Sequence, residues 1–109
     1  MKTLLILRHA KSSWRDESLV DHDRPLNERG KRDAPRMGRL MRAQDLEPDA
    51  VICSTAKRAR KTADKAIKAS GYETCVELRD ELYHAPPNVY IDVLRGQVDQ
   101  RQCVMVVGT

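Results

Sequence analysis

The sequence predicts one domain, a three-layer α/β/α sandwich over residues 1–109 with a mainly parallel sheet. Two observations predict this fold class. Short apolar runs alternate along the chain with segments whose apolar residues recur at helical spacing, a pattern typical of parallel sheets. Hydrophobic residues make up 40% of the chain, whereas aromatic residues make up 4% and phenylalanine is absent. An aliphatic core of this kind favours helices packed on a sheet over a β-sandwich.

The first half of the chain predicts a strand, a loop and a helix. Thr3–Leu7 is a continuous apolar run, which is typical of a strand covered on both faces. Residues 11–24 are polar and lack a period, so we expect a surface loop. Asn27 is a suitable N-cap for an amphipathic helix that runs to about Gln44. Pro35 predicts a kink or a later start of this helix, because proline removes an interior hydrogen bond.

The second half predicts three strands and two helices. The expected strands are Ala50–Cys53, Glu73–Leu78 and Cys103–Val107. Ser54 or Thr55 is suited to cap the second helix, and Gly71 is suited to end it. Asn88 is suited to cap a third helix, with Val98 on its apolar face. The resulting order, β-α-β-α-β-α-β, predicts right-handed crossovers between parallel strands.

Composition limits the classes of function. The chain has 20 basic and 16 acidic residues, a net charge of +4 that favours anionic ligands. The basic residues are interleaved with acidic ones, which argues against nucleic acid as a partner. Cys53, Cys75 and Cys103 lack the spacing of zinc ligands, and we expect buried thiols in a reducing compartment. No run approaches the roughly 20 apolar residues of a membrane helix, and the first residues lack a signal-peptide cleavage site. We therefore expect a cytoplasmic protein that uses no metal or other cofactor and binds no membrane.

Polar side chains with phosphate chemistry follow two of the expected strands. Arg8 and His9 come directly after the first strand, and Ser54 follows the second, where a helix begins. Ligands of parallel α/β sheets bind beyond the carboxyl ends of the strands, and a helix N-terminus there attracts anions. Arg58 lies near the start of that helix, and its guanidinium group matches the geometry of phosphate oxygens. A neutral His9 can attack phosphorus, so the sequence predicts a phosphate site with His9 as nucleophile and Arg8, Arg58 and Ser54 as ligands.

Three further residues of the loop 11–24 allow both a functional and a structural interpretation. Trp14 either shapes the mouth of the site or covers apolar surface. Asp21 and its neighbouring aspartates lack the glycine and the distal glutamate of a calcium loop, so we expect no metal there. His22 is expected to be an ordinary polar residue.

Four stretches, in order along the chain, resemble the histidine phosphatase superfamily, which has the phosphoglycerate mutase-like fold. They read LLILRHAKSSW, DHDRPLNERGKRDAPRMG, CSTAKRARKTA and ELYHA, and the SixA-type phosphohistidine phosphatases are the most similar branch. The resemblance implies that His9 is transiently phosphorylated and that Arg8, Arg24 and Arg58 bind phosphate. Asn27 stands where the family has Ser or Thr near the phosphate, and we expect it to contact the substrate. The implied reaction is two-step hydrolysis of a phosphohistidine-bearing protein or a small phosphorylated substrate, which releases inorganic phosphate.

Two departures from the family pattern affect the expected activity. His84 stands where relatives carry an acid that protonates a poor leaving group, and phosphohistidine needs little such help. The family's last strand is followed by Gly-His, whereas this chain reads VVGT at Thr109. The resemblance thus implies a domain that lacks the second catalytic histidine and the last helix and strand, with uncovered apolar surface and weak or absent activity. Two alternatives remain: a non-catalytic phosphate- or phosphoprotein-binding module, and a small-molecule phosphomonoesterase or phosphomutase.

Overall fold

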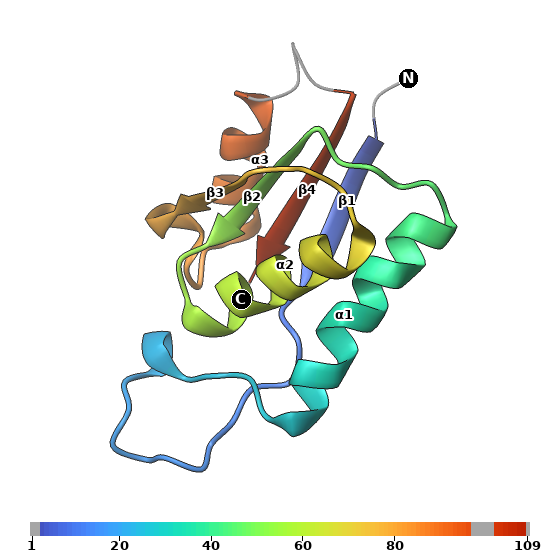
Figure 1. Ribbon diagram of the computed structural model, residues 1–109. Helices are drawn as coiled ribbons and strands as arrows, with labels where there is room; N and C mark the ends of the chain where they lie inside the picture. Colours follow the sequence, from blue (N-terminus) through green and yellow to red (C-terminus); the bar gives the residue numbers. More distant parts are fainter. Residues whose placement is uncertain (1–2, 97–101, 109) are drawn as a thin grey trace.

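The computed structural model describes residues 3–96 and 102–108, so Val98 lies outside the described residues (Figure 1). One four-stranded sheet has the order β1-β4-β2-β3, and all its strand pairs are parallel. The strands are β1 (Thr3–Arg8), β2 (Ala50–Ser54), β3 (Val76–Arg79) and β4 (Cys103–Gly108). The helices are α1 (Glu28–Ala43), α2 (Lys57–Ser70) and α3 (Pro87–Arg95), with short 3-10 turns η1 (Asp21–Asp23) and η2 (Asp80–Leu82). The predicted α/β fold with a parallel sheet is confirmed.

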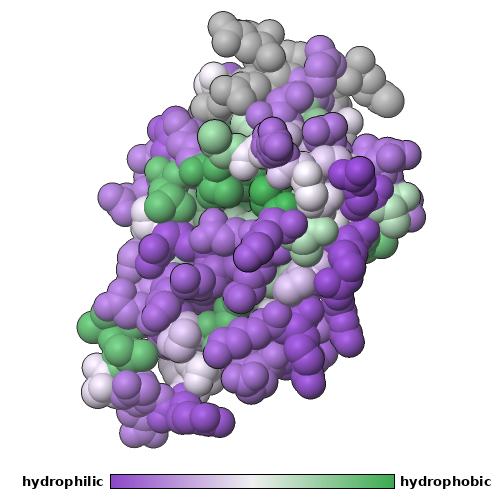
Figure 2. All heavy atoms as spheres, viewed as in Figure 1, coloured by the Kyte–Doolittle hydropathy of each residue, from purple (hydrophilic) through white to green (hydrophobic). Residues whose placement is uncertain are grey.

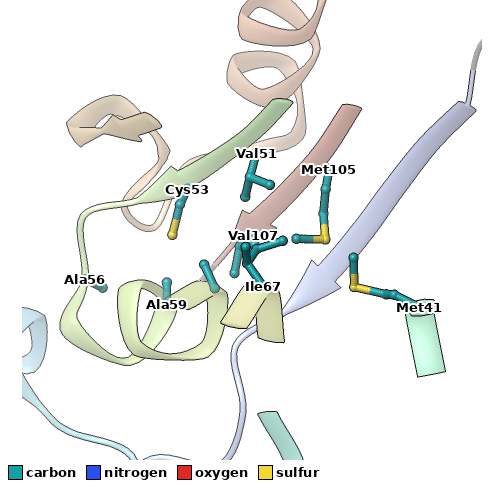
Figure 3. Packing of buried hydrophobic residues seen from close by; sticks show 9 residues of the cluster. Met41, Val51, Cys53, Ala56, Ala59, Ile67, Met105 and Val107 are labelled. Atoms are coloured by element: carbon teal, nitrogen blue, oxygen red, sulfur yellow. The ribbon is translucent and has the colours of Figure 1, made fainter. Parts of the chain in front are cut away.

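Two hydrophobic cores lie on opposite faces of the sheet. The larger core joins α1 and α2 to the sheet, and its buried members are Met41, Val51, Cys53, Ala56, Ala59, Ala63, Ile67, Met105 and Val107 (Figure 3). The smaller core lies under α3, and its buried members are Ile52, Leu82, Val104 and Val106. Consecutive residues of β2 and of β4 therefore face opposite cores, which explains why both strands read as continuous apolar runs. The surface drawn in Figure 2 is mostly hydrophilic, interrupted by hydrophobic patches.

Strand β1 differs from the prediction of a strand covered on both faces. Leu5 and Leu7 pack against the larger core, but Leu4 is 48% exposed and Ile6 is 78% exposed. Among the described residues, β1 pairs with β4 alone and so lies at an edge of the sheet. Leu4 and Ile6 therefore form an exposed apolar face of β1 in the described part of the chain.

Helix α1 begins as predicted and continues past its proline. The Asn27 side chain accepts a hydrogen bond from the Gly30 N–H at 2.8 Å, which caps the helix. The prediction of a later start at Pro35 is wrong, because the helix is continuous from residue 28 to 43. Close packing on α2 stabilises this segment: a Cβ atom added to Gly38 would lie 1.9 Å from the Ala66 carbonyl oxygen.

The starts of α2 and α3 differ from the prediction. Ala56, rather than Ser54 or Thr55, is the N-cap of α2, and it makes no side-chain cap hydrogen bond. Pro87 is the first residue of α3, a position whose N–H has no acceptor within the helix, so proline fits there without loss of a hydrogen bond. Asn88 consequently lies inside the helix. Gly71 ends α2 with a φ of 77°, the left-handed conformation that glycine adopts without strain.

The cysteines occupy three different environments. Cys53 is buried in the larger core, Cys103 is half-buried, and Cys75 is exposed, so the expectation of burial is wrong for Cys75. In the described part of the chain, no group of three or more His, Cys, Asp or Glu side chains is arranged to hold a metal ion. None of the helices found there is long and apolar enough to cross a bilayer.

Candidate phosphate site

A cavity of about 770 Å³ gathers the predicted site residues from distant parts of the chain. Its lining includes Arg8 and His9 at the end of β1, Arg24 from the following loop and Arg58 from the first turn of α2. The arrowheads of β2 and β4 in Figure 1, and that of β1 (blue) in Figure 3, point to this end of the domain. The structure thus brings the four predicted residues together at the carboxyl edge of the sheet, where Arg29 and His84 also line the cavity.

Two backbone carbonyl groups hold His9, one through its N–H and one through its ring. Its N–H donates to the Gly108 carbonyl at 3.1 Å, which places His9 beside the end of β4. The Nδ1 atom lies 2.8 Å from the Ala10 carbonyl oxygen. A carbonyl oxygen is only an acceptor, so Nδ1 carries the proton and Nε2 is the unprotonated nitrogen of the neutral ring.

The electrostatic environment keeps this ring neutral. Burial lowers the pKa of His9 below its ordinary value of 6.5, and the charges of Arg58, Arg8 and Arg24 lower it further. The hydrogen bond to the Ala10 carbonyl opposes this shift, because it is strengthened by protonation. The net direction favours the form of His9 that can act as a nucleophile near neutral pH.

Two helices fix the loop that follows His9. The Thr62 hydroxyl accepts the Ala10 N–H at 2.9 Å and donates to the Arg58 carbonyl at 2.7 Å. The Lys11 carbonyl accepts the N–H of Asn27 at 2.9 Å, at the start of α1. Sequence reasoning missed Thr62, although it lies one helical turn after Arg58, where a threonine hydroxyl commonly bonds back to the helix.

The buried arginines are held by defined partners. The Arg24 side chain donates from Nε to the Ser13 carbonyl at 3.1 Å and from Nη2 to the Ser12 hydroxyl at 2.6 Å. Trp14 is 72% exposed and covers Arg24, whose Cζ atom lies 3.1 Å from the centroid of the indole ring. The tryptophan therefore does shape the mouth of the cavity, by shielding one guanidinium group from water.

Asp21 is the main site residue that the sequence did not reveal. Its carboxylate accepts hydrogen bonds from Arg24, Arg58, Tyr83 and His84. The bond from Tyr83, and after it those from Arg58, His84 and Arg24, hold the pKa of this carboxyl well below its usual range. Asp21 is 37 residues from Arg58 and 62 from Tyr83, so no local pattern in the sequence could have indicated these contacts.

Asn27 and Ser54 are not placed as expected for substrate ligands, whereas His84 belongs to the site. Asn27 caps α1 and Ser54 is fully buried at the end of β2, where its hydroxyl accepts the Ala56 N–H at 3.3 Å. Neither is among the residues that line the cavity. His84, whose role the sequence left open, does line it, and its backbone has the left-handed φ of 51°. Its Nε2–H donates to Asp21 Oδ2 at 2.7 Å.

The fold and the cavity define a class of protein: a parallel α/β domain whose strand ends carry a histidine among arginines. Within that class, the chain belongs to the histidine phosphatase superfamily. The family model for branch 1 of this superfamily matches residues 4–84, a segment that contains every predicted site residue.

Comparisons with individual proteins agree with this family. The chain is 39% identical over 102 residues to an uncharacterised protein of Mycobacterium tuberculosis, covering 94% of this chain and 61% of that relative. It is 41% identical over 75 residues to a 2,3-bisphosphoglycerate-dependent phosphoglycerate mutase of Thermobifida fusca, covering 65% of this chain and 30% of the mutase. The crystal structure of a SixA-type protein from Agrobacterium tumefaciens matches with a TM-score of 0.88 and 33% identity, over 97% of this chain and 68% of that one.

Proposed function

We propose that this domain hydrolyses phosphohistidine by two-step phosphoryl transfer through His9. The observation that carries the proposal is the tautomer of His9. Because Nδ1–H donates to the Ala10 carbonyl, Nε2 is left as the basic nitrogen of a neutral ring, in a cavity lined by arginines. Such a nitrogen is a competent nucleophile, and fixed guanidinium groups stabilise the charge on a transferring phosphoryl group.

The reaction needs no group beyond these side chains and water. In the first step, the lone pair of His9 Nε2 forms a bond to phosphorus, and the bond from phosphorus to the leaving group breaks. The leaving imidazole takes the electron pair and a proton from solvent water. In the second step, a water oxygen bonds to phosphorus, the bond from phosphorus to Nε2 breaks, and the electron pair returns to His9. The attacking water gives its proton to solvent, and inorganic phosphate is released while Arg8, Arg24 and Arg58 hold its oxygens.

Two features support phosphohistidine over a phosphate ester as the substrate. His84 stands where the family pattern has a carboxylic acid, and an imidazole leaving group needs less protonation than an alkoxide does. The SixA-type structural relative is named as a phosphohistidine phosphatase. The phosphorylated histidine would belong to a protein or to a smaller phosphorylated compound.

A second candidate function is phosphate binding, with turnover that is slow or absent. The residue that follows β4 is Thr109, where the family motif Gly-His has its second histidine. The Gly108 carbonyl accepts the His9 N–H, so this position follows a residue that touches the nucleophile. Loss of one preorganised donor to a transferring group costs about 10²–10³ in rate. We therefore propose that turnover by this chain is slow, and that Thr109→His raises it.

The test is to trap the covalent intermediate. The protein is mixed with a phosphohistidine-containing peptide, quenched in alkali and mapped by mass spectrometry. We expect a phosphoryl adduct on His9 that is absent from His9→Gln and strongly reduced in Arg58→Gln. Arg60→Gln is the matched control, because Arg60 lies on the same helix, bonds the Thr55 carbonyl and does not line the cavity. Phosphate binding without any adduct would favour the binding module, and equal peptide hydrolysis by wild type and His9→Gln would overturn the mechanism.

A further inference from the structure

The Asp21 carboxylate lines a cavity that is expected to bind anions. Its Oδ1 atom accepts from Arg24 Nη1 at 2.9 Å. Its Oδ2 atom accepts from Arg58 Nη2 at 2.9 Å, from the Tyr83 hydroxyl at 2.5 Å and from His84 Nε2 at 2.7 Å. One negative side chain therefore connects donors from three separate segments of the chain: the loop before α1, the first turn of α2 and the segment after η2.

The two arginines need a partner of this kind before any ligand binds. The Arg58 side chain is 3% exposed and the Arg24 side chain 8% exposed, and a buried charge without a counter-charge is strongly unfavourable. Arg58 also donates from Nη1 to the Asp21 backbone carbonyl at 2.7 Å, so one residue holds both of its terminal nitrogens. This two-point contact fixes the plane of the guanidinium group as well as its position.

Asp21 leaves donors available on both guanidinium groups. Each guanidinium has five N–H groups. Among the described residues, Arg24 donates three of them, to Ser13, Asp21 and Ser12. Arg58 donates two to Asp21, and its side chain also interacts with the Tyr83 hydroxyl. The remaining N–H groups belong to side chains whose positions are already fixed, and these side chains line the same cavity as His9.

We propose that Asp21 is the positioning residue of the phosphate site: it fixes Arg24 and Arg58 as a pair whose remaining N–H groups receive the phosphoryl oxygens. The inference rests on the proposed function, since it presumes that the cavity binds a phosphoryl group. It extends that function by giving a role to a negative residue that does not contact the phosphoryl group itself. Tyr83 and His84 also hold the carboxylate, because both donate to Oδ2, the oxygen that accepts from Arg58.

The opposite role would be competition, in which the Asp21 carboxylate occupies the arginines and must be displaced by phosphate. The two roles predict opposite signs for the same variant. If Asp21 competes, its neutralisation tightens anion binding, because one negative charge leaves a positive cavity. If Asp21 positions the arginines, the same change weakens anion binding, although it makes the cavity more positive.

The experiment measures the dissociation constants of inorganic phosphate and tungstate at pH 7 by calorimetry. Asp21→Asn keeps the shape of the side chain and removes its charge. We expect weaker binding by about tenfold or more, comparable to the loss of a residue that orients a metal ligand. Asp23→Asn is the matched control: it makes the same change in the same 3-10 turn, but Asp23 does not line the cavity, and we expect affinity within about twofold of wild type. Asp21→Glu, which retains the charge, should recover part of the affinity.

A second variant keeps the inference testable if Asp21→Asn does not fold. Tyr83→Phe removes one hydrogen bond to the carboxylate, and Tyr83 does not line the cavity. We expect it to weaken phosphate binding by a few-fold with a cooperative melting transition retained. Unchanged or tighter binding in Asp21→Asn, or in Tyr83→Phe if the first variant is unfolded, would overturn the positioning role alone. Failure of the wild-type chain to bind either anion would instead overturn the proposed function, and this inference with it.

Discussion

Replacement of Thr62 by valine tests how the loop after His9 is held. Thr62 is 1% exposed, and its hydroxyl accepts the Ala10 N–H at 2.9 Å while donating to the Arg58 carbonyl at 2.7 Å. Valine has nearly the same shape, so the substitution opens no cavity. It removes the acceptor of the Ala10 N–H, which belongs to the peptide directly after His9.

The expected loss of stability follows from these contacts. The Arg58 carbonyl keeps its helical backbone bond from residue 62, so the loss of the hydroxyl donor matters little there. The Ala10 N–H loses its partner in a half-buried position, and an unsatisfied donor of this kind costs about 1–3 kcal/mol. We expect Thr62→Val to reduce the free energy of unfolding by about 1–2 kcal/mol, because the site is only partly closed to water. Thr62→Ser keeps the hydroxyl and loses one methyl group, worth about 0.8 kcal/mol.

Urea denaturation and phosphate titration together check this reasoning. Thr62→Val should weaken phosphate binding as well as stability, because the tautomer of His9 depends on the placement of the Ala10 carbonyl. Thr62→Ser should bind phosphate like wild type. Thr74→Val is the control: its hydroxyl donates to the Pro48 carbonyl at 3.0 Å, away from the cavity, and its loss should leave phosphate binding unchanged. If Thr62→Val matches wild type in both measurements, Thr62 does not hold this loop.

The remaining predictions concern protonation, packing and thiol chemistry. Burial and then the nearby arginines lower the pKa of His9, so an NMR titration of its ring should show a midpoint below 6.5. The contribution of His9 to the free energy of unfolding should fall as the pH drops from 6.5 through that midpoint, because the unfolded chain binds the proton more readily. A midpoint above 6.5 would contradict this. Gly38→Ala should destabilise the fold by about 1–3 kcal/mol in urea, because its Cβ would lie 1.9 Å from a carbonyl oxygen of α2, whereas Gly96→Ala has 3.5 Å of room and should be nearly neutral. Cys75 is exposed, while burial raises the pKa of the Cys53 thiol to about 12. A thiol reagent at pH 8 should therefore modify Cys75 rapidly and leave Cys53 unmodified until the protein unfolds.

The order of elements could be predicted from the sequence, because each element has a local signal. Alternation of apolar runs with helical periodicity gave the strands and helices, and Asn27 and Gly71 marked two helix ends correctly. The position of each strand in the sheet has no such signal. β1 and β4 have similar apolar sequences, yet β1 lies at the edge of the sheet and β4 lies between β1 and β2. Ile6 is exposed because it lies on the face of β1 that the smaller core does not reach.

The site could be predicted where it depends on strand ends and motifs, and not where it depends on contacts between segments. Arg8, His9 and Arg58 meet because the carboxyl ends of parallel strands share one edge. The sequence predicts Asp21 only as a polar loop residue, because its contacts with Arg58 and Tyr83 exist only once the fold brings those residues to it. Attraction of a negative ligand alone would predict only basic side chains in a phosphate site, so charge gives no reason to include a carboxylate.

The same positive charges account for two properties of the site. Burial, and after it the charges of Arg58, Arg8 and Arg24, lower the pKa of His9 and so favour an unprotonated Nε2 before a ligand binds. A bound phosphoryl group brings negative charge to the same place and offsets those arginines. The site therefore favours a neutral His9 when it is empty and tolerates a charged ring when phosphate is bound. A histidine that is neutral for attack, and stabilised once it carries a phosphoryl group, is what covalent transfer through an imidazole requires.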